Sequence, residues 1–218
     1  MAMISKKPFV FLDFDGTITE IDVMIAIMKQ FGPEEWIPLK EQMLSRQISV
    51  RKGVGAMFSL IPSSEKNRVI SFVKNEIKIR DGFPEFLDFC QTEAIEYKVI
   101  SGGLDFYVYP LIEKWVPKDK ILCNEVDFTS SHFQVKWTYP CDSYCHLDCG
   151  FCKVSLVRTC DPAVYNRVLI GDSLTDLGAA RITETVIGRD YLLDQCRAEG
   201  IEAFSFKNFF DVKEVLKR

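Results

Sequence analysis

Short runs of β-branched and aromatic residues alternate along the chain with longer segments of helical periodicity. Five runs are apolar enough to form buried strands, namely 8–12, 96–100, 120–123, 167–171 and 184–188. Helical patterns accompany them at 82–94, 104–114, 153–160, 174–182 and 190–199. Strands that alternate with helices indicate βαβ units around a parallel sheet. We therefore expect an α/β fold, with a Rossmann-like parallel sheet and helices on both of its faces.

A long insertion separates the first predicted strand from the second. Its helical patterns lie at 21–31, 33–46, 50–60 and 63–78. Residues 20–80 are far too many for an ordinary βα loop. We expect them to form a small helical cap over a core built from residues 1–19 and 81–218. A second irregular region, 125–152, begins with an alternating pattern that predicts a β-hairpin.

Composition and charge exclude some classes of partner. The chain has 218 residues and a net charge of −4, which gives no basic surface for nucleic acid. It contains no run of about 18 apolar residues, so no membrane span is expected. The apolar stretch at 9–12 is too short for the core of a signal peptide. We expect a cytoplasmic protein with a small-molecule partner; its oligomeric state is left open.

Polar motifs follow three of the predicted strands. Asp13 and Asp15 come after the first, and Asp172 follows the run 167–171. The carboxyl ends of parallel strands meet at one edge of the sheet, where ligands bind. Alternate residues of an extended chain point the same way, so Asp13 and Asp15 repel unless a positive species lies beside them. Three carboxylates suit a hard divalent cation such as Mg²⁺.

The other two motifs carry groups that suit a phosphate. Ser101 and Gly102, after the run 96–100, offer a hydroxyl and backbone N–H groups. Lys153 adds a positive charge at the start of a predicted helix. Each motif alone also fits a turn, a helix cap or a solvated lysine. Their common position at the strand ends favours a site for phosphoryl transfer.

In their order and spacing, DFDGT, ISGG, the single lysine and GDSLTD resemble the four motifs of the haloacid dehalogenase-like phosphatases. The resemblance implies that Asp13 is the nucleophile and forms an aspartyl-phosphate. It also implies that Asp15 protonates the leaving oxygen and later deprotonates the hydrolytic water. Such a pair needs one ionised and one protonated carboxyl group, which different environments can provide.

The same resemblance implies the remaining roles. Mg²⁺ would be held by Asp13, the backbone carbonyl of Asp15, and Asp172. Ser101, Gly102 and Lys153 would hold the phosphoryl oxygens.

In the size of its insertion, the chain resembles the phosphoserine phosphatase-like branch of this family. In that branch a glutamate nine residues after the nucleophile and a cap arginine grip the amino acid. Here Asp22 takes the place of the glutamate, and Gly53 stands where the arginine is expected. Glycine cannot clamp a carboxylate, so phosphoserine is disfavoured. Arg51 lies close by, and phosphoserine or another small phosphorylated metabolite remains the alternative substrate.

Longer segments resemble the phosphatases of bacterial methionine salvage, at 32–36, 51–64, 78–86, 99–111 and 188–193. The resemblance implies removal of phosphate from an enol intermediate with a methylthio group. Met24, Met28, Met57 and Phe58 could line an apolar pocket for that group, because methionine packs adaptably. Their spacing fits the core of the cap still better.

Four of the eight cysteines form a cluster, Cys141, Cys145, Cys149 and Cys152. Four thiolates can close a tetrahedral zinc site, although only the last pair has the usual CxxC spacing. Reduced thiols or facultative disulfides are the alternative. In either case the cluster would fix the loop that delivers Lys153.

Two other functions fit parts of the sequence. A phosphomutase or phosphotransferase would use the same nucleophile but exclude water. A non-enzymatic, cysteine-rich metal-binding module would not need Asp13, Asp15, Lys153 and Asp172 together, so the intact set favours an enzyme.

Overall fold

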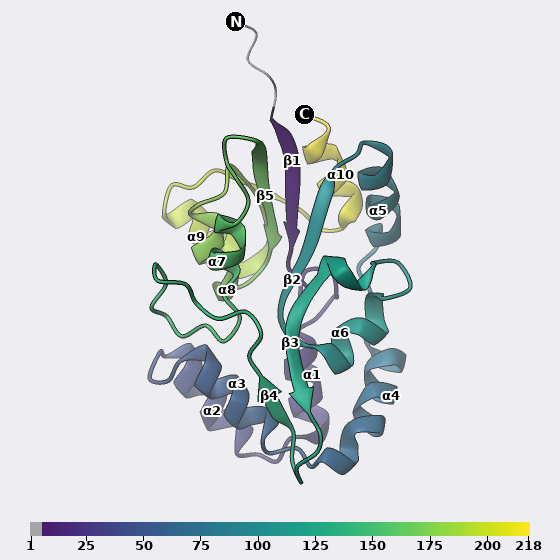
Figure 1. Cartoon of the computed structure of the whole chain (residues 1–218), viewed down its shortest axis with the longest axis vertical. Coiled ribbons are helices and arrows are strands. Elements are labelled where there is room, and N and C mark those ends of the chain that lie inside the picture. The colour runs from purple at the N-terminus through teal and green to yellow at the C-terminus, as the bar shows by residue number, and fades with distance from the viewer. Residues whose placement is uncertain (1–5) are drawn as a thin grey trace, which may run out of the picture.

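The computed structural model describes residues 6–218 and contains a seven-stranded sheet (Figure 1). The strand order is β4-β3-β2-β1-β5-β6-β7, and every neighbouring pair is parallel except β3 and β4. The strands are β1 (Lys7–Leu12), β2 (Glu96–Leu104), β3 (Ile121–Asp127), β4 (Gln134–Lys136), β5 (Tyr165–Gly171), β6 (Thr185–Gly188) and β7 (Ala203–Ser205). Because β1 lies in the centre, the residues that follow it are surrounded by the ends of its neighbours.

Helices cover both faces of the sheet, as the alternating pattern predicts (Figure 1). One face carries α5 (Phe83–Thr92), α6 (Asp105–Ile112) and α10 (Phe209–Leu216), and the other carries α7 (Lys153–Arg158), α8 (Leu174–Ala180) and α9 (Asp190–Ala198). Successive side chains of β1 point alternately to the two faces of the sheet. Val10 and Leu12 join the apolar cluster on the first face, and Phe11 joins the cluster on the second. The predicted α/β class is confirmed.

The insertion forms four α-helices beyond the carboxyl ends of the strands (Figure 1). They are α1 (Val23–Phe31), α2 (Trp36–Leu44), α3 (Val50–Phe58) and α4 (Lys66–Glu76), with a short 3-10 turn, η1 (Ser63–Glu65), before the last. Ile27, Phe58 and Val69 of these helices are fully buried in the same apolar cluster as Leu12 of the sheet. The insertion therefore packs continuously against the core.

Three local features differ from the sequence-based expectation. The strand predicted at 96–100 continues to Leu104, so Ser101 and Gly102 lie within β2; its pairing with β3 is displaced between Ile100 and Leu104. This irregularity bends the strand at the motif. The short strand β7 and the final helix α10 were not predicted. The hairpin within 125–152 is present as β3 and β4, with Val126 opposite Val135.

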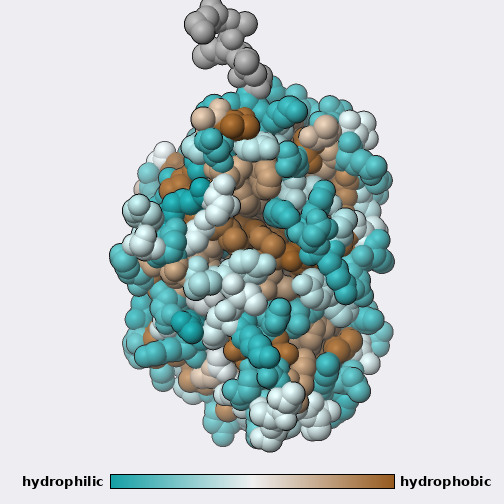
Figure 2. All heavy atoms as spheres, viewed as in Figure 1, coloured by the Kyte–Doolittle hydropathy of each residue, from teal (hydrophilic) through white to brown (hydrophobic). Residues whose placement is uncertain are grey.

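The surface carries no large uniform patch on the face that Figure 2 shows. Hydrophilic residues predominate there, and apolar residues gather mainly near its centre (Figure 2). No helix among residues 6–218 combines the length and apolar character that a membrane crossing requires.

Candidate active site

The loop after β1 is locked against the loop after β5. Its first residue, Asp13, donates its backbone N–H to the carbonyl oxygen of Ile170 at 2.9 Å. Thr17 Oγ1 donates to Asp172 Oδ1, also at 2.9 Å. Gly16 between them has φ +80°, and a Cβ there would overlap the Asp172 carboxylate. Only glycine fits both requirements, which explains the glycine of DFDGT.

Lys153 lies between two buried carboxylates. Its Nζ is 2.5 Å from Asp13 Oδ1 and 2.6 Å from Asp176 Oδ1, and all three side chains are at most 5% exposed. The second oxygen of Asp176 accepts hydrogen bonds from the Ser173 N–H and hydroxyl, both at 3.0 Å, in the capping box of α8. Asp176 therefore orients Lys153 and fixes the start of α8 at once.

The charges of this cluster do not balance. Burial, and then the charge of Asp176, raises the pKa of Asp13, whereas Lys153 lowers it. Burial and Asp176 likewise raise the pKa of Asp172, to about 6. Burial lowers the pKa of Lys153, but the charges of Asp13 and Asp176 outweigh it and keep the ammonium protonated. One ammonium thus faces three carboxylates, which can place oxygens within 4.8 Å of one another. This oxygen-rich, negatively charged set fits a hard divalent cation.

Asp15 has an environment of its own. One oxygen accepts the backbone N–H of Val23 at 3.1 Å, and the other accepts the hydroxyl of Tyr107 at 3.3 Å. Burial raises the pKa of Asp15 well above its usual value, and the charges of Asp22 and Asp13 raise it further. A carboxyl group in this position favours the protonated form and can act as a general acid.

Ser101 and Gly102 of β2 lie close to Asp15, in the loop after β1. The Ser101 hydroxyl is fully buried and accepts the N–H of Gly103 at 2.9 Å, so its proton is free to donate. A Cβ at Gly103 would lie 2.8 Å from Ser101 Oγ and 2.9 Å from Asp15 Oδ2. A Cβ at Gly102 would meet nothing within 4 Å, because this residue lines the cavity described below.

Asp22 and Gly53 occupy the cap side. Asp22 is the N-cap of α1 and accepts the Ile25 N–H at 2.9 Å, while it also lines the cavity. Gly53 is buried between two cap helices, and a Cβ there would lie 3.0 Å from the sulfur of Met43. The missing side chain at position 53 thus gives Met43 of α2 room against α3.

A cavity of about 600 Å³ joins these groups to the cap. Its polar end holds Asp13, Asp15, Lys153 and Asp172. The remaining wall is largely apolar and includes Met24, Ile25, Met43, Leu44, Val50, Val54, Trp137 and Phe151. Of the four cap residues considered from sequence, only Met24 lines this cavity, and the others are fully buried core residues. The core interpretation of Met28, Met57 and Phe58 is therefore the one that the structure supports.

One residue that supports the site, Arg80, escaped the sequence analysis. Arg80 is 7% exposed and donates to the carbonyl oxygens of Gly16 at 2.7 Å, Thr17 at 2.8 Å and Thr19 at 3.0 Å. It therefore stabilises the loop after β1 through the backbone carbonyl oxygens of that loop. Tyr107, which contacts Asp15, is also fully buried. A buried arginine gives no local signal in a sequence, because only the folded loop creates its acceptors.

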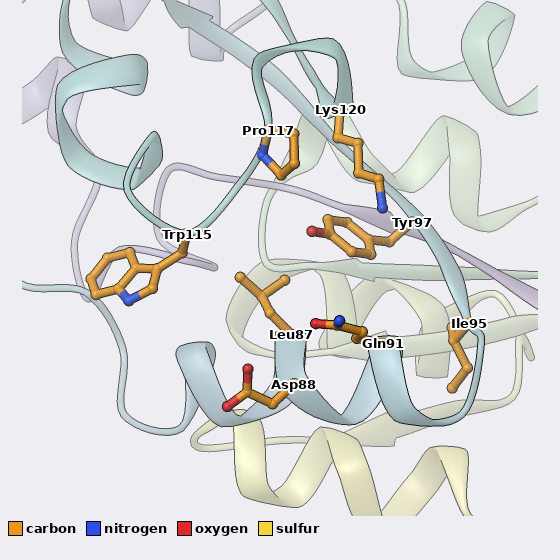
Figure 3. A pocket seen from close by; sticks show the side chains of 8 residues that line it. All are labelled: Leu87, Asp88, Gln91, Ile95, Tyr97, Trp115, Pro117 and Lys120. Carbon is orange, nitrogen blue, oxygen red and sulfur yellow. The ribbon is translucent and has the colours of Figure 1, made fainter.

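A second cavity of about 320 Å³ lies away from this chemistry (Figure 3). It is formed by α5, the beginning of β2 and the segment before β3, at the opposite end of the strands. Its lining residues are Leu87, Asp88, Gln91, Ile95, Tyr97, Trp115, Pro117 and Lys120. None of the predicted site residues reaches it.

Residues 10–181 match the family model of the haloacid dehalogenase-like hydrolases. The chain is 45% identical over 214 residues to the 2-hydroxy-3-keto-5-methylthiopentenyl-1-phosphate phosphatase of Geobacillus kaustophilus, and the match covers 98% of this chain and 97% of that protein. It is 47% identical over 212 residues to the bifunctional enzyme MtnB/MtnX of Bacillus licheniformis. That match covers 97% of this chain and spans only 50% of the longer relative.

Solved structures of phosphoserine phosphatases share the fold. The aspartyl-phosphate analogue complex of one such enzyme aligns with a TM-score of 0.69 at 18% identity, over 98% of this chain and 99% of that chain. The enzyme from T. onnurineus aligns with a TM-score of 0.71 at 16% identity, over 100% of this chain and 99% of that chain. At such low identity the likeness extends to the fold alone.

Proposed function

The chain belongs to the haloacid dehalogenase-like hydrolase family, and from this premise we propose that it is a Mg²⁺-dependent phosphatase of a small metabolite. The observation that carries the proposal is the buried contact of Lys153 with Asp13 at the polar end of the cap cavity. A nucleophilic carboxylate beside a fixed ammonium, with a raised-pKa carboxyl group two residues away, is the arrangement that phosphoryl transfer requires.

In the proposed reaction Asp13 attacks phosphorus and Asp15 donates a proton to the leaving oxygen. Asp15 then removes a proton from the water that hydrolyses the aspartyl-phosphate. Lys153, Ser101 and the N–H of Gly102 hold the phosphoryl oxygens and offset their charge. Asp176 acts through Lys153, which it keeps in place.

Magnesium completes this proposal. Asp13, Asp172 and the backbone carbonyl of Asp15 would hold the ion. When bound, it supplies the positive charge that keeps Asp13 ionised and neutralises the phosphoryl group.

We assign 2-hydroxy-3-keto-5-methylthiopentenyl-1-phosphate as the substrate. The support is the full-length similarity to phosphatases named for this compound, such as the Geobacillus kaustophilus protein. The apolar wall of the cavity, with Met24 and Met43, suits a methylthio tail. Gly53 provides no side chain to hold the carboxylate of phosphoserine at the position expected for the arginine; Arg46 is the cap arginine that lines the cavity. The reaction then belongs to methionine salvage, and a small metabolite of this kind fits the expected cytoplasmic location.

The proposal includes a structural zinc ion at Cys141, Cys145, Cys149 and Cys152, beside the cavity that Cys149 helps to line. Their sulfur atoms lie within 4.8 Å of one another.

A panel of phosphate monoesters tests the activity and the substrate together. Phosphate release is measured with the methylthio enol phosphate, phosphoserine and para-nitrophenyl phosphate, each with Mg²⁺ and with a chelator. We expect the highest kcat/KM for the enol phosphate and no turnover without the metal. A preference for phosphoserine would overturn the assignment of the substrate, and metal-independent turnover would overturn the mechanism.

A further inference from the structure

The segment that joins β4 to α7 has no regular secondary structure over residues 137–152 (Figure 1). Two of its large apolar side chains, Tyr144 and Leu147, are 79% and 71% exposed. Asp148 and Gly150 have left-handed backbone conformations, with φ of 50° and 75°. Phe151 and Cys152 are buried at the end of the segment, whereas its exposed tip has few apolar contacts, so a cross-link there would stabilise one conformation.

The four thiols have the geometry of a zinc site. Cys145 Sγ lies 3.8 Å from Cys149 Sγ, and the four Sγ atoms all lie within 4.8 Å of one another. Zinc–sulfur bonds of about 2.3 Å in a tetrahedron place neighbouring sulfurs about 3.8 Å apart. The N–H of Cys149 also points at Cys141 Sγ, at 3.5 Å, as backbone amides do toward metal-bound thiolates.

On one side this cysteine loop (residues 141–152) is joined to the catalytic lysine. Cys152 immediately precedes Lys153, and its N–H donates to the Tyr139 carbonyl at 2.9 Å. Asp142 receives two hydrogen bonds from Arg158 at the other end of α7, at 2.7 and 2.8 Å. Both ends of the short helix that carries Lys153 are therefore attached to the loop.

On the other side the same loop is joined to the cap. The carboxylate of Asp148 accepts the hydroxyl of Ser49, the N-cap of α3, at 2.6 Å. Its backbone carbonyl accepts the N–H of Arg51 at 3.2 Å, and the Arg51 guanidinium lies 3.6 Å from the carboxylate. Residues Val50 and Val54 of this same helix line the cavity.

We propose that the cysteine loop is a zinc-bound strut that fixes the cap helix α3 relative to Lys153. One Zn²⁺ binds the four thiolates and releases the protons that the thiols carried. The metal restricts the motion of the loop, and the hydrogen bonds of Asp148 hold the start of α3 against the restricted loop. The catalytic consequence rests on the function proposed above, whereas the zinc site and its contacts do not.

The metal site is tested without reference to activity. The purified protein is analysed for bound metal, and its zinc is exchanged for Co²⁺. We expect one zinc per chain and, with Co²⁺, the thiolate charge-transfer bands and strong d–d bands of a tetrahedral site. Cys145→Ser should weaken these bands, and Cys90→Ala, which alters a buried cysteine of α5 outside the cluster, should not. Protein purified without bound metal, or cobalt bands that Cys145→Ser leaves unchanged, would contradict the proposed zinc site.

The strut is tested at its cap contact, where the cysteines stay intact. Asp148→Ala should leave the Co²⁺ spectrum unchanged and raise KM for the enol phosphate severalfold, up to about tenfold, the effect of one lost charge-assisted hydrogen bond. Asp148→Asn, which keeps an acceptor for Ser49, should recover part of the loss. Asp161→Ala is the matched control, because within residues 6–218 this exposed carboxylate bonds only to the Ala163 N–H of its own turn.

The outcomes separate the two proposals. An unchanged KM in Asp148→Ala, with the cobalt spectrum intact, would overturn the strut and leave the zinc site standing. Inactivity of the unmodified protein on the enol phosphate would instead overturn the proposed function; the strut is then measured as a change in hydrogen exchange at α3 on zinc removal. No change there would contradict it.

Discussion

Lys153 Nζ lies 2.5 Å from Asp13 Oδ1, although the two residues are 140 positions apart in the chain. One begins the short helix α7 and the other follows the central strand β1. Their contact holds together the ends of β1 and β5, because Lys153 also binds Asp176 at the start of α8.

Replacing the nucleophile tests its assignment. Asp13→Asn keeps the shape of the side chain but removes its charge, and an amide is a poor nucleophile toward phosphorus. We expect kcat to fall by about 10³-fold or more. Phosphate release measures the effect, and circular dichroism confirms that the variant is folded. Turnover near the level of the unmodified enzyme would assign the nucleophile to another residue.

Removing the lysine tests the balance of buried charge. Lys153→Met leaves Asp13 and Asp176 without their cation, and breaking a buried pair in this way costs about 3 kcal/mol or more. We expect that loss in the free energy of unfolding, measured by urea denaturation at pH 8 with a chelator.

The loss in Lys153→Met should shrink as the pH falls. The pKa of Asp13 is higher in the folded state than in the unfolded state, so as the pH falls the folded state binds a proton before the unfolded state does. This proton neutralises the Asp13 carboxylate that Lys153→Met leaves without a cation. A loss that grows toward acid pH would contradict this account of the cluster.

The alkaline limb of the pH profile tests Asp15 as the acid. Its raised pKa favours the protonated form, and turnover falls as the pH rises through that pKa. The charge of Asp22 contributes to the shift, so Asp22→Asn should lower the pKa of Asp15 and move the alkaline limb of kcat to lower pH. Asparagine still caps α1, which keeps the fold intact. An unmoved limb would show that another group is the acid.

The contact between α2 and α3 tests the shape of the substrate cavity. A methyl group at Gly53 would press on Met43, whose side chain lines the cavity. Gly53→Ala should therefore raise KM for the enol phosphate severalfold. Adding Met43→Ala should relieve the pressure and bring KM back toward that of Met43→Ala alone. Strictly additive effects in this double-mutant cycle would mean that the two residues do not share the space.

The sequence alone was sufficient to predict the fold class and the order of the motifs, because buried parallel strands are near-continuous apolar runs. It placed Ser101 after a strand, whereas β2 continues through the motif with a displaced pairing. That irregularity depends on the neighbouring strand, and a local pattern cannot report it. The strand β7, three residues long, is too short to give any pattern.

The roles of single polar residues were harder to predict for the same reason. The resemblance to the phosphoserine phosphatase-like branch implies a substrate contact for Asp22, and the structure adds a local role as the N-cap of α1. Three acceptors of Arg80 lie in the loop after β1, more than sixty residues earlier in the chain, and another is the carbonyl oxygen of Lys207, 127 residues later. Such partners exist only once the sheet has formed.

The phosphorylated enzyme gives the most direct test of the central claim. Asp15→Asn should slow hydrolysis of the intermediate, so that a labelled phosphoryl group accumulates on the protein after an acid quench. We predict that peptide mapping places the label on Asp13 and that Asp13→Asn abolishes it. Label on another residue, or none at any time during turnover, would contradict the account.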